Sequence, residues 1–294
     1  MTQTDWLAQR FEEQRPQLRA VAYRMLGSLS EAEDAVQEGW LRLARSDVAA
    51  IENLGAWLTT VVGRVCLDML RSRTARREES LDVRVPDPIV GPLDGPGDPE
   101  HEAVLADSVS LALMVVLETL SPAERLAFVL HDTFGVPFAA IAPIVNRSVD
   151  ATKMLASRAR TRVRGAGPTP GGDRARQREA VAAFVAAARE GDFEALLRVL
   201  DPEVVLRADG GTAGPPSRLL RGAEAVASSA LTFRAAAVSG RTVLVNGAPG
   251  AIGIRDGEVI SVLAFNVVDG RIVEIDVLAD PERLAAIDVA FLEV

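Results

Sequence analysis

The sequence contains one cysteine, one tyrosine and two histidines among 294 residues. With Cys66 as its only cysteine, the chain can form neither an internal disulfide nor a multi-cysteine metal site, which fits a reducing compartment. The longest apolar run, LALMVVL at residues 111–117, is too short to cross a membrane. The N-terminus lacks a basic stretch followed by an apolar run, so we expect a cytoplasmic protein without a signal peptide. A hydrophobic content of 48% still supports folded cores.

Acidic and basic residues are segregated along the chain, although the net charge is −9. Residues 57–77 carry five arginines against one aspartate, a net charge of +4, and residues 147–164 carry six basic residues against one acid, a net charge of +5. Residues 78–108 between them have nine acids and one arginine, a net charge of −8. Two basic segments around an acidic one indicate nucleic-acid binding, which the overall charge alone argues against.

The first 77 residues have helical periodicity and no strand alternation. In SEAEDAVQEGWLRL, at residues 30–43, Ser30 and Glu33 predict a capping box at the start of a helix. One stripe of this helix is apolar and predicts a core face: Ala32, Val36, Trp40 and Leu43. A second stripe mixes acids with Leu41. A long helix over 56–77 follows, with a basic stripe and a basic C-terminal end.

Two segments interrupt the helical pattern. Residues 78–100 contain five prolines and three glycines, which predicts a connector without helix or central strand. GAGPTPGGD, at residues 165–173, predicts a flexible linker. The expected organisation is a helical domain at 5–78, the connector at 79–103, a second helical domain at 104–164, the linker at 165–173 and a third domain at 174–294.

Residues 139–164 have the spacing of a helix-turn-helix motif, with a tight turn at Asn146–Ser148. Asn146 takes a turn position that usually belongs to glycine, and Pro143 lies inside the short first helix. Residues of the second helix expected near base edges are Asp150, Ala151, Lys153, Met154 and Ser157. Those expected near phosphates are Arg158, Arg160 and Arg162. Arg147 and Ser148 of the turn are also expected to contact DNA. The alternative is an ordinary helical hairpin with a solvated basic end.

The third domain has a different pattern. Helices are predicted at about 175–190 and 192–200, followed by alternating stretches that predict strands. Two of the turns, RDGE and VDGR, are typical of β-hairpins, so this domain is predicted to be α+β. Residues 174–294 contain no His, Tyr, Trp or Cys. Because general acid–base catalysis usually needs such groups or a poised carboxylate, we expect no catalytic residue.

As a set, four stretches resemble regions two and four of the extracytoplasmic-function sigma factors of the sigma-70 family, over about residues 10–164. They are RPQLRAVAYRMLGSLSEAEDAVQEGWLRLAR, AWLTTVVGRVCLDMLRSR, LSPAERLAFVLHDTFGVPFAAIA and ASRARTRV. The tail resembles the SnoaL-like domain fused to one subgroup of this family. DVRVPDPIVGP occupies the place of that subgroup's Trp-Leu-Pro-Glu-Pro motif, with Arg84 and Val85 where Trp and Leu are expected. ADGGT at 208–212 resembles its Asp-Gly-Gly motif, and ADPERL at 279–284 its Asn-Pro-Asp-Lys-Leu motif.

The resemblance implies a multidomain fold: two all-α domains, sigma regions two and four, followed by an α+β cone of the nuclear-transport-factor-2 type. It implies binding to core RNA polymerase, through a coiled coil of the largest catalytic subunit, and to promoter DNA. On the matching positions, the polymerase contact is Asp34, Gln37, Glu38, Leu41 and Arg42. The contact to the downstream promoter strand is Asn53, Arg64, Asp68, Arg71, Arg73, Arg76 and Arg77. The regulatory contact between domains is Pro86, Asp87, Pro88, Asp209, Gly210, Gly211, Asp280, Pro281 and Leu284.

Some alternatives remain open on the sequence. The acidic connector either mimics RNA in the polymerase channel, as the resemblance implies, or is a solvated spacer. The tail either regulates promoter binding or is an enzyme or small-molecule sensor fused to a DNA-binding half. A self-contained repressor is a third function for the whole chain. We expect neither a metal nor a cofactor, and a small-molecule ligand of the tail stays open.

Overall fold

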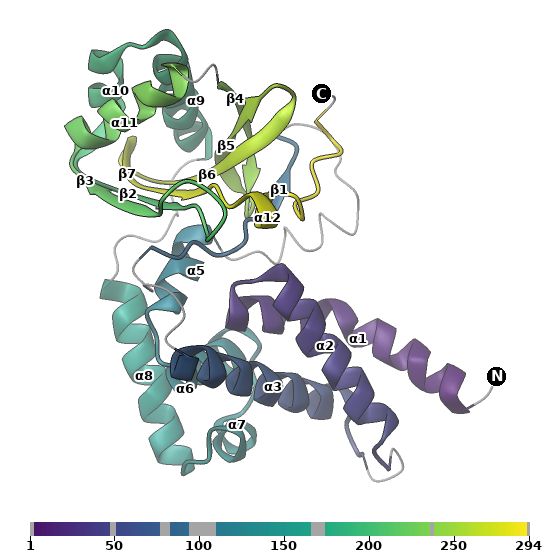
Figure 1. Cartoon of the computed structure of the whole chain (residues 1–294). Helices are drawn as coiled ribbons and strands as arrows, with labels where there is room; N and C mark the ends of the chain where they lie inside the picture. Colours follow the sequence, from purple (N-terminus) through teal and green to yellow (C-terminus); the bar gives the residue numbers. More distant parts are fainter. Residues whose placement is uncertain are drawn as a thin grey trace. The chain divides into compact units, whose positions relative to one another are not determined.

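The computed structural model describes residues 3–47, 51–76, 83–93, 110–165, 174–235 and 238–292 (Figure 1). The chain divides into two compact units. The helical unit comprises Met1–Glu79 and Val116–Gly167, and the sheet unit comprises Ser80–Val115 and Pro168–Val294. The helical unit therefore contains the helical domain predicted at 5–78 and most of the one predicted at 104–164. The sheet unit takes residues 83–93 from the predicted connector and residues 110–115 from the start of the second helical domain.

The first half of the helical unit consists of α1 (Gln3–Leu26), α2 (Leu29–Ala44) and α3 (Leu54–Arg76). Gly27, at φ 67°, ends α1 in the left-handed region. Ser28 is the N-cap of α2, and its Oγ accepts a hydrogen bond from the Glu31 amide. The capping box predicted at Ser30 is therefore wrong by one half-turn, because Gly27 ends α1 early enough for the helix to begin at Leu29.

The apolar stripe predicted on α2 packs as expected. Ala32, Val36 and Leu43 are fully buried, and the Trp40 ring contacts that of Phe11 at 5.1 Å between centroids. Cys66 of α3 is buried in the same core, and this burial raises the pKa of its thiol. Its role is therefore packing, as expected for a free cysteine in apolar surroundings.

The second half of the helical unit begins within α5 (Leu111–Glu118), at Val116. It continues with α6 (Pro122–Phe128), the π-helical turn η2 (Val129–Thr133), α7 (Phe138–Val145) and α8 (Val149–Gly165). Ser121 and Glu124 form a reciprocal capping box at the start of α6. His131 bonds the Val136 carbonyl through Nδ1 and stacks on Phe138. A structural role for this histidine is therefore supported.

The sheet unit contains α9 (Arg174–Glu190), α10 (Phe193–Val199), α11 (Ala223–Ala235) and the short α12 (Pro281–Leu284). Its strands are β1 (Val90–Gly91), β2 (Leu200–Asp209), β3 (Arg218–Arg221), β4 (Ser239–Val245), β5 (Ala248–Arg255), β6 (Glu258–Val268) and β7 (Arg271–Leu278). They form one sheet in the order β1-β4-β5-β6-β7-β2-β3, in which β2 and β7 are parallel and the other neighbours antiparallel.

The predicted hairpins are confirmed. Asp256–Gly257 and Asp269–Gly270 both take positive φ at both residues, the conformation of a tight hairpin turn. Asn246–Gly247 does the same between β4 and β5. The helices expected near 175–190 and 192–200 are α9 and α10. The sequence pattern did not predict α11, β3 or the edge strand β1.

The sheet has a core on each face. Helices α9, α10 and α11 cover one face (Figure 1). Phe184, Val226 and Phe265 lie in the core on that face. The other face is covered by parts of the connector, the start of α5 and the C-terminal segment, including Val85, Val90, Leu111, Leu284 and Ile287. Consecutive residues of β6, Ala264 and Phe265, lie in different cores, as the two-residue period of a strand requires. The connector therefore contributes to the fold of the sheet unit.

Candidate functional site

The face of α2 predicted to bind polymerase lies at the surface. Leu41 is 39% exposed, which is high for a large aliphatic side chain. Asp34 and Gln37 are exposed beside it. Arg42 Nε donates to Glu38 Oε1 at 2.8 Å, an ion pair between consecutive turns of one helix. The surface thus has an apolar centre bordered by charges, a composition suited to a protein interface.

The basic face of α3 is only partly available to DNA. Arg64 is exposed and forms no ion pair among the described residues. Arg71 and Asp68 are both exposed and lie 3.8 Å apart. Asn53 caps α3 by accepting a hydrogen bond from the Ala56 amide at 3.0 Å, and its exposed side chain keeps an amide group for other contacts. Four predicted positions therefore share the accessible part of this region.

Arg73 differs from the other predicted DNA contacts. It is 9% exposed, forms an ion pair with Glu31, and donates to the Leu26 carbonyl at 3.3 Å. Its guanidinium holds α3 against the turn between α1 and α2, and these contacts occupy the groups that would bind a phosphate. The Arg76 side chain and Arg77 lie outside the described residues, and their predicted role is a hypothesis still.

The helix-turn-helix motif is formed by α7 and α8. Asn146 adopts the left-handed conformation at φ 55° as the C-cap of α7, as predicted for this turn. Pro143 lies within α7, which still forms its last turn. Ser148 Oγ caps α8 by accepting from the Ala151 amide at 3.2 Å. The motif therefore has the expected backbone despite its two unusual residues.

The outer face of α8 carries the predicted base-reading residues. Met154 is 58% exposed, and Asp150, Lys153 and Ser157 are exposed beside it. Thr152, Ala156 and Ala159 of the same helix are buried, so the exposed stripe is a consequence of how α8 packs. An exposed methionine on a recognition helix provides apolar surface, which DNA offers at thymine methyl groups. Ala151 is half-buried on the same side.

The arginines of α8 are not equivalent. Arg160 Nε bonds Asp132 Oδ1 at 2.6 Å, and Arg162 Nη1 bonds Glu124 Oε2 at 2.7 Å. Burial raises the pKa of Glu124, but hydrogen bonds from Ser121 and the charge of Arg162 outweigh burial and lower it overall. Arg147 and Arg158 are exposed and form no ion pair within the described part of the chain. They are the better placed phosphate contacts.

The two halves of the helical unit contact each other through α1, α3 and α6. Arg125 of α6 is 2% exposed, and its Nη1 donates to the Met25 carbonyl at 2.8 Å. Its Nη2 lies 3.1 Å from a carboxylate oxygen of Glu118, which is buried as well. A Cβ on Gly63 of α3 would come within 3.4 Å of Leu126 and Leu130. The two predicted DNA-binding helices, α3 and α8, therefore belong to one compact unit.

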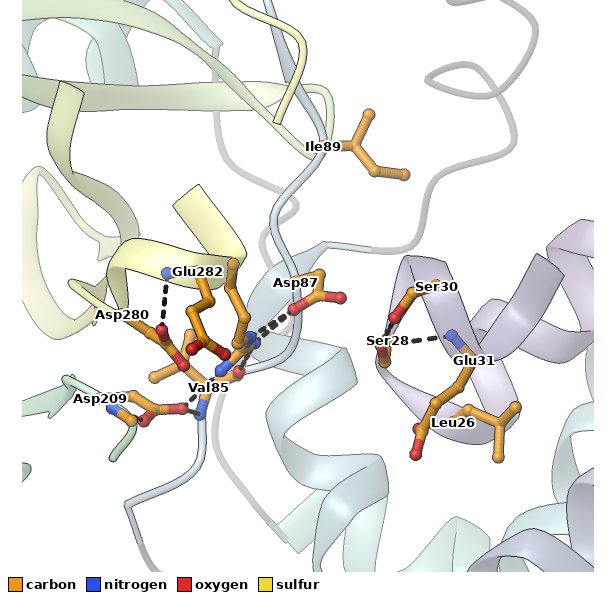
Figure 2. Close-up of polar contacts among 12 residues, drawn as sticks. Leu26, Ser28, Ser30, Glu31, Val85, Asp87, Ile89, Asp209, Asp280 and Glu282 are labelled. Carbon is orange, nitrogen blue, oxygen red and sulfur yellow. Dashed lines mark hydrogen bonds and ion pairs between the residues drawn. The ribbon is translucent and has the colours of Figure 1, made fainter. Parts of the chain in front are cut away.

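A second cluster joins the connector to the sheet. Arg283 of α12 donates through Nε to Asp87 Oδ1 at 2.6 Å and through Nη1 to Asp209 Oδ2 at 2.8 Å (Figure 2). Its Nη2 donates to the Val85 carbonyl, and the Val85 amide donates to Asp209 Oδ2 at 3.0 Å. Burial lowers the pKa of Arg283, but the charges of Asp87 and Asp209 outweigh it and raise the pKa overall. We call Val85, Asp87, Asp209 and Arg283 the linker latch, because they hold the connector that links the two helical domains.

The connector is also bound through its backbone. The Ile89 amide donates to Asn246 Oδ1 at 3.0 Å, and the Asn246 amide donates to the Ile89 carbonyl at 2.8 Å. β1 then pairs with β4 as an edge strand. All side chains from Val85 to Gly91, Pro86 and Pro88 included, are buried. A solvated spacer is therefore wrong for this part of the connector.

The two motifs of the tail meet at this cluster. A Cβ on Gly211, which has φ 59°, would lie 2.1 Å from Asp280 Oδ2, and one on Gly210 would lie 1.7 Å from the Pro215 carbonyl oxygen. Asp280 caps α12 through the Glu282 amide at 3.0 Å (Figure 2). Only glycine fits such close approaches. Pro281 is the first residue of α12, and Leu284 is buried at its end.

Arg283 and Asn246 were not predicted as site residues. Arg283 is the one basic residue of ADPERL, and the signal for it was its match to the Lys of the Asn-Pro-Asp-Lys-Leu motif. Asn246 had a signal only as the first residue of an Asn-Gly turn. On the same face of the sheet, Arg207 bonds Glu274 and Asp276. Burial and the charge of Glu274 raise the pKa of Asp276 to about 7, although Arg207 lowers it.

The described residues contain no group of three or more His, Cys, Asp or Glu that could hold a metal ion. No helix in the described part of the chain is long and apolar enough to span a membrane.

The two halves of the helical unit match sigma-factor families. The Sigma-70 region 2 family matches residues 10–76, and the Sigma-70, region 4 family matches residues 110–163. A chain with both regions in this order is a sigma factor. The more specific assignment comes from whole-chain relatives.

The chain belongs to the ECF RNA polymerase sigma factors. It is 37% identical over 288 residues to ECF RNA polymerase sigma factor SigJ of Mycobacterium tuberculosis strain H37Rv, covering 93% of this chain and 91% of the relative. It is 34% identical over 291 residues to the probable ECF RNA polymerase sigma factor SigI of that organism, covering 97% of each. The crystal structure of SigJ matches with a TM-score of 0.73 and 34% identity, covering 96% of this chain and 99% of that one. The fold of the tail is therefore the SnoaL-like cone.

Proposed function

We propose that this sigma factor is a promoter-specificity subunit that its own SnoaL-like domain regulates by holding the segment between regions two and four. The observation that carries the proposal is the linker latch. Asp87 precedes region four in the chain, yet its carboxylate binds Arg283 of the C-terminal domain. The domain thus holds the segment that determines how far the two regions can separate.

The closed helical unit supports this regulation. The α3 face is expected to hold the opened downstream strand, and α8 to read the upstream element in duplex DNA. These are different positions on a promoter, so the two regions have to separate on the DNA. Arg125 of region four joins it to region two through the Met25 carbonyl, and its ion pair with Glu118 of region four holds the guanidinium in place. Release of the connector from the SnoaL-like domain would allow regions two and four to separate.

The surfaces divide the work between polymerase and DNA. The Leu41 face of α2 binds the coiled coil of the largest catalytic subunit of core polymerase. Asn53, Arg64, Asp68 and Arg71 hold the non-template strand, with a flipped base in a pocket and arginines on the backbone. The exposed face of α8 reads the major groove. Because both partners are intracellular machinery, the protein acts in the cytoplasm.

A catalytic tail has little support. In the described part of the cone, the residues lining the cavity between the sheet and helices α9 and α11 include no Asp, Glu, His, Cys or Tyr. General acid–base chemistry has no group there to act through. The sigma-factor relatives likewise support a regulator of transcription, and the alternative of a fused enzyme is not favoured.

The test is in vitro transcription with core polymerase, using the full chain and a chain truncated after residue 173. The helical unit ends at Gly167, so the truncation removes the cone without cutting into that unit. We expect both proteins to co-purify with core polymerase and the truncated one to change promoter output several-fold. Equal output from the two proteins would contradict regulation by the tail. Tight DNA binding without polymerase would instead identify a repressor.

A further inference from the structure

The SnoaL-like domain contains a cavity, partly open to solvent, that none of the surfaces above uses. It has a volume of about 90 Å³ and lies between the sheet and helices α9 and α11. Its walls are mainly apolar: Phe184, Leu206, Ala230, Leu263 and Val277. Concave, mainly apolar sites of this kind are where proteins bind small molecules.

Ser229 of α11 indicates that the cavity has a polar occupant. The residue is 7% exposed and lines the cavity. Its hydroxyl Oγ is buried and has no hydrogen-bond partner among the described residues. An unpaired buried hydroxyl is costly, and the great majority of buried polar groups are paired. An oxygen atom of a bound molecule would satisfy it.

The charge of the lining limits the chemical class of this molecule. Arg189 and Arg218 are the charged residues among the cavity's described lining, and it contains no acid. Arg218 of β3 is exposed and forms no ion pair with any described residue. A free guanidinium at the edge of an apolar cavity favours a carboxylate, to which it can donate two parallel hydrogen bonds.

A larger groove extends the site. It has a volume of about 1030 Å³ and shares Ala208, Arg218, Val238 and Val277 with the cavity. Its walls also include Gly210 and Pro281, from the two motifs around the linker latch, and Leu284. The charged residues of its lining are Arg218, Arg255 and Glu258, so the arginines outnumber the acid. An engineered apolar cavity of ~150 Å³ accepts benzene, so 90 Å³ would hold a chain of roughly four carbons. The rest of a longer chain would lie in the groove.

We propose that this cavity and groove bind a small aliphatic carboxylic acid, with its chain against the apolar walls and its carboxylate at Arg218 and Ser229. The apolar lining selects the hydrocarbon, the arginine selects the negative charge, and the serine hydroxyl donates to a carboxylate oxygen. The site is independent of DNA and polymerase binding, so its test does not depend on the sigma-factor function.

The test is calorimetric titration of the full-length protein with octanoate, 1-octanol and octylamine, which have the same chain and differ in head group. We expect saturable binding of one octanoate per chain, at least tenfold weaker binding of octanol and no binding of octylamine. Arg218→Ala should reduce octanoate binding to the level of octanol. Ser229→Ala should weaken octanoate binding about tenfold, the effect of one hydrogen bond.

Ala230→Leu fills the cavity and should abolish binding of octanoate, while Arg198→Ala, an exposed arginine of α10 outside the lining, should leave it unchanged. If Ala230→Leu fails to fold, the two smaller substitutions decide the question: Arg218→Ala at an exposed position and Ser229→Ala at a buried one. Absence of saturable octanoate binding to the natural chain overturns the proposal. Equal binding of octanoate and octylamine, or octanoate binding that neither Arg218→Ala nor Ser229→Ala weakens, overturns it as well.

Discussion

Arg283 Nε lies 2.6 Å from Asp87 Oδ1, although 196 residues separate the two in the chain. The same guanidinium reaches Asp209 and the Val85 carbonyl. One side chain of a four-residue helix thus connects the linker to the end of β2.

Arg283→Ala should release the connector, residues 83–93, from the sheet unit. Asp87 and Asp209 are both buried, and loss of their shared cation should cost about 3–5 kcal/mol, typical of breaking a buried pair. Hydrogen exchange at the Val85 and Ile89 amides should accelerate in the variant.

Arg283→Lys should release the connector as well. A lysine ammonium group lacks the planar guanidinium that donates to Asp87, Asp209 and the Val85 carbonyl together. Arg241→Ala, at an exposed position of β4, is the matched control and should leave exchange unchanged. Unchanged protection of Val85 in Arg283→Ala would show that the linker is held by β1 and Asn246 instead.

The arginines of α3 should separate into two functional groups. Arg64→Ala combined with Arg71→Ala should abolish promoter opening and leave polymerase binding and stability unchanged, because both side chains are exposed. Permanganate reactivity of promoter thymines and polymerase pull-down measure the two effects. Opening that survives the double substitution would mean that the strand lies on another face.

Arg73→Ala should have the opposite profile. Its guanidinium is paired with Glu31 in a partly buried site, so its removal should destabilise the helical unit by about 2–4 kcal/mol. Thermal unfolding followed by tryptophan fluorescence is specific for this unit, because Trp6, Trp40 and Trp57 all lie in it. A stable Arg73→Ala protein that fails only in promoter opening would restore Arg73 as a DNA contact.

Leu41→Asp should weaken binding to core polymerase at least tenfold. The side chain lies at the centre of the proposed interface, where a charge would be desolvated on binding. Because Leu41 is already 39% exposed, the unfolding temperature should change little. Gln9→Asp adds the same charge to an exposed position of α1 and should retain full affinity in the same binding titration.

Gly63→Leu should open the helical unit. The added side chain would meet Leu126 and Leu130 across the contact between α3 and α6, and overpacking of this kind costs about 1–3 kcal/mol. If the free protein is held closed, a shift of 1.4 kcal/mol toward the open form raises apparent polymerase affinity about tenfold. Gly63→Ala is the smaller control. Equal or weaker polymerase binding by a helical Gly63→Leu protein would contradict a closed, inhibited form.

The stability of the sheet unit should fall as pH rises from about 4 to about 7. Burial and Glu274 raise the folded-state pKa of Asp276 to about 7, so over this window the folded chain keeps a proton that the unfolded chain has lost. The unfolded state binds fewer protons, and stability therefore decreases with pH. Calorimetry should show the slope in the natural chain and in the exposed control Asp269→Asn. Asp276→Asn should remove it, and a persisting slope would assign the effect to other groups.

Much of the local structure could be predicted from the sequence. The Asp-Gly pairs at 256–257 and 269–270 form the predicted hairpin turns, because both residues tolerate positive φ wherever the chain needs it. The capping box of Ser121 and Glu124 forms for the same local reason. The cap at Ser30 failed because a neighbouring S-x-x-E pattern competes with it, and which one acts depends on where α1 ends.

The class of this protein follows from the sequence alone. Helical periodicity, caps and turns depend on residues close together in the chain, and the motifs of regions two and four are contiguous stretches. Only the tertiary structure decided the roles of Arg73, Arg125 and Arg283. A charged side chain looks the same in a sequence whether it faces solvent or a carboxylate. That choice depends on partners 42, 100 and 196 residues away, which the fold brings within hydrogen-bonding distance.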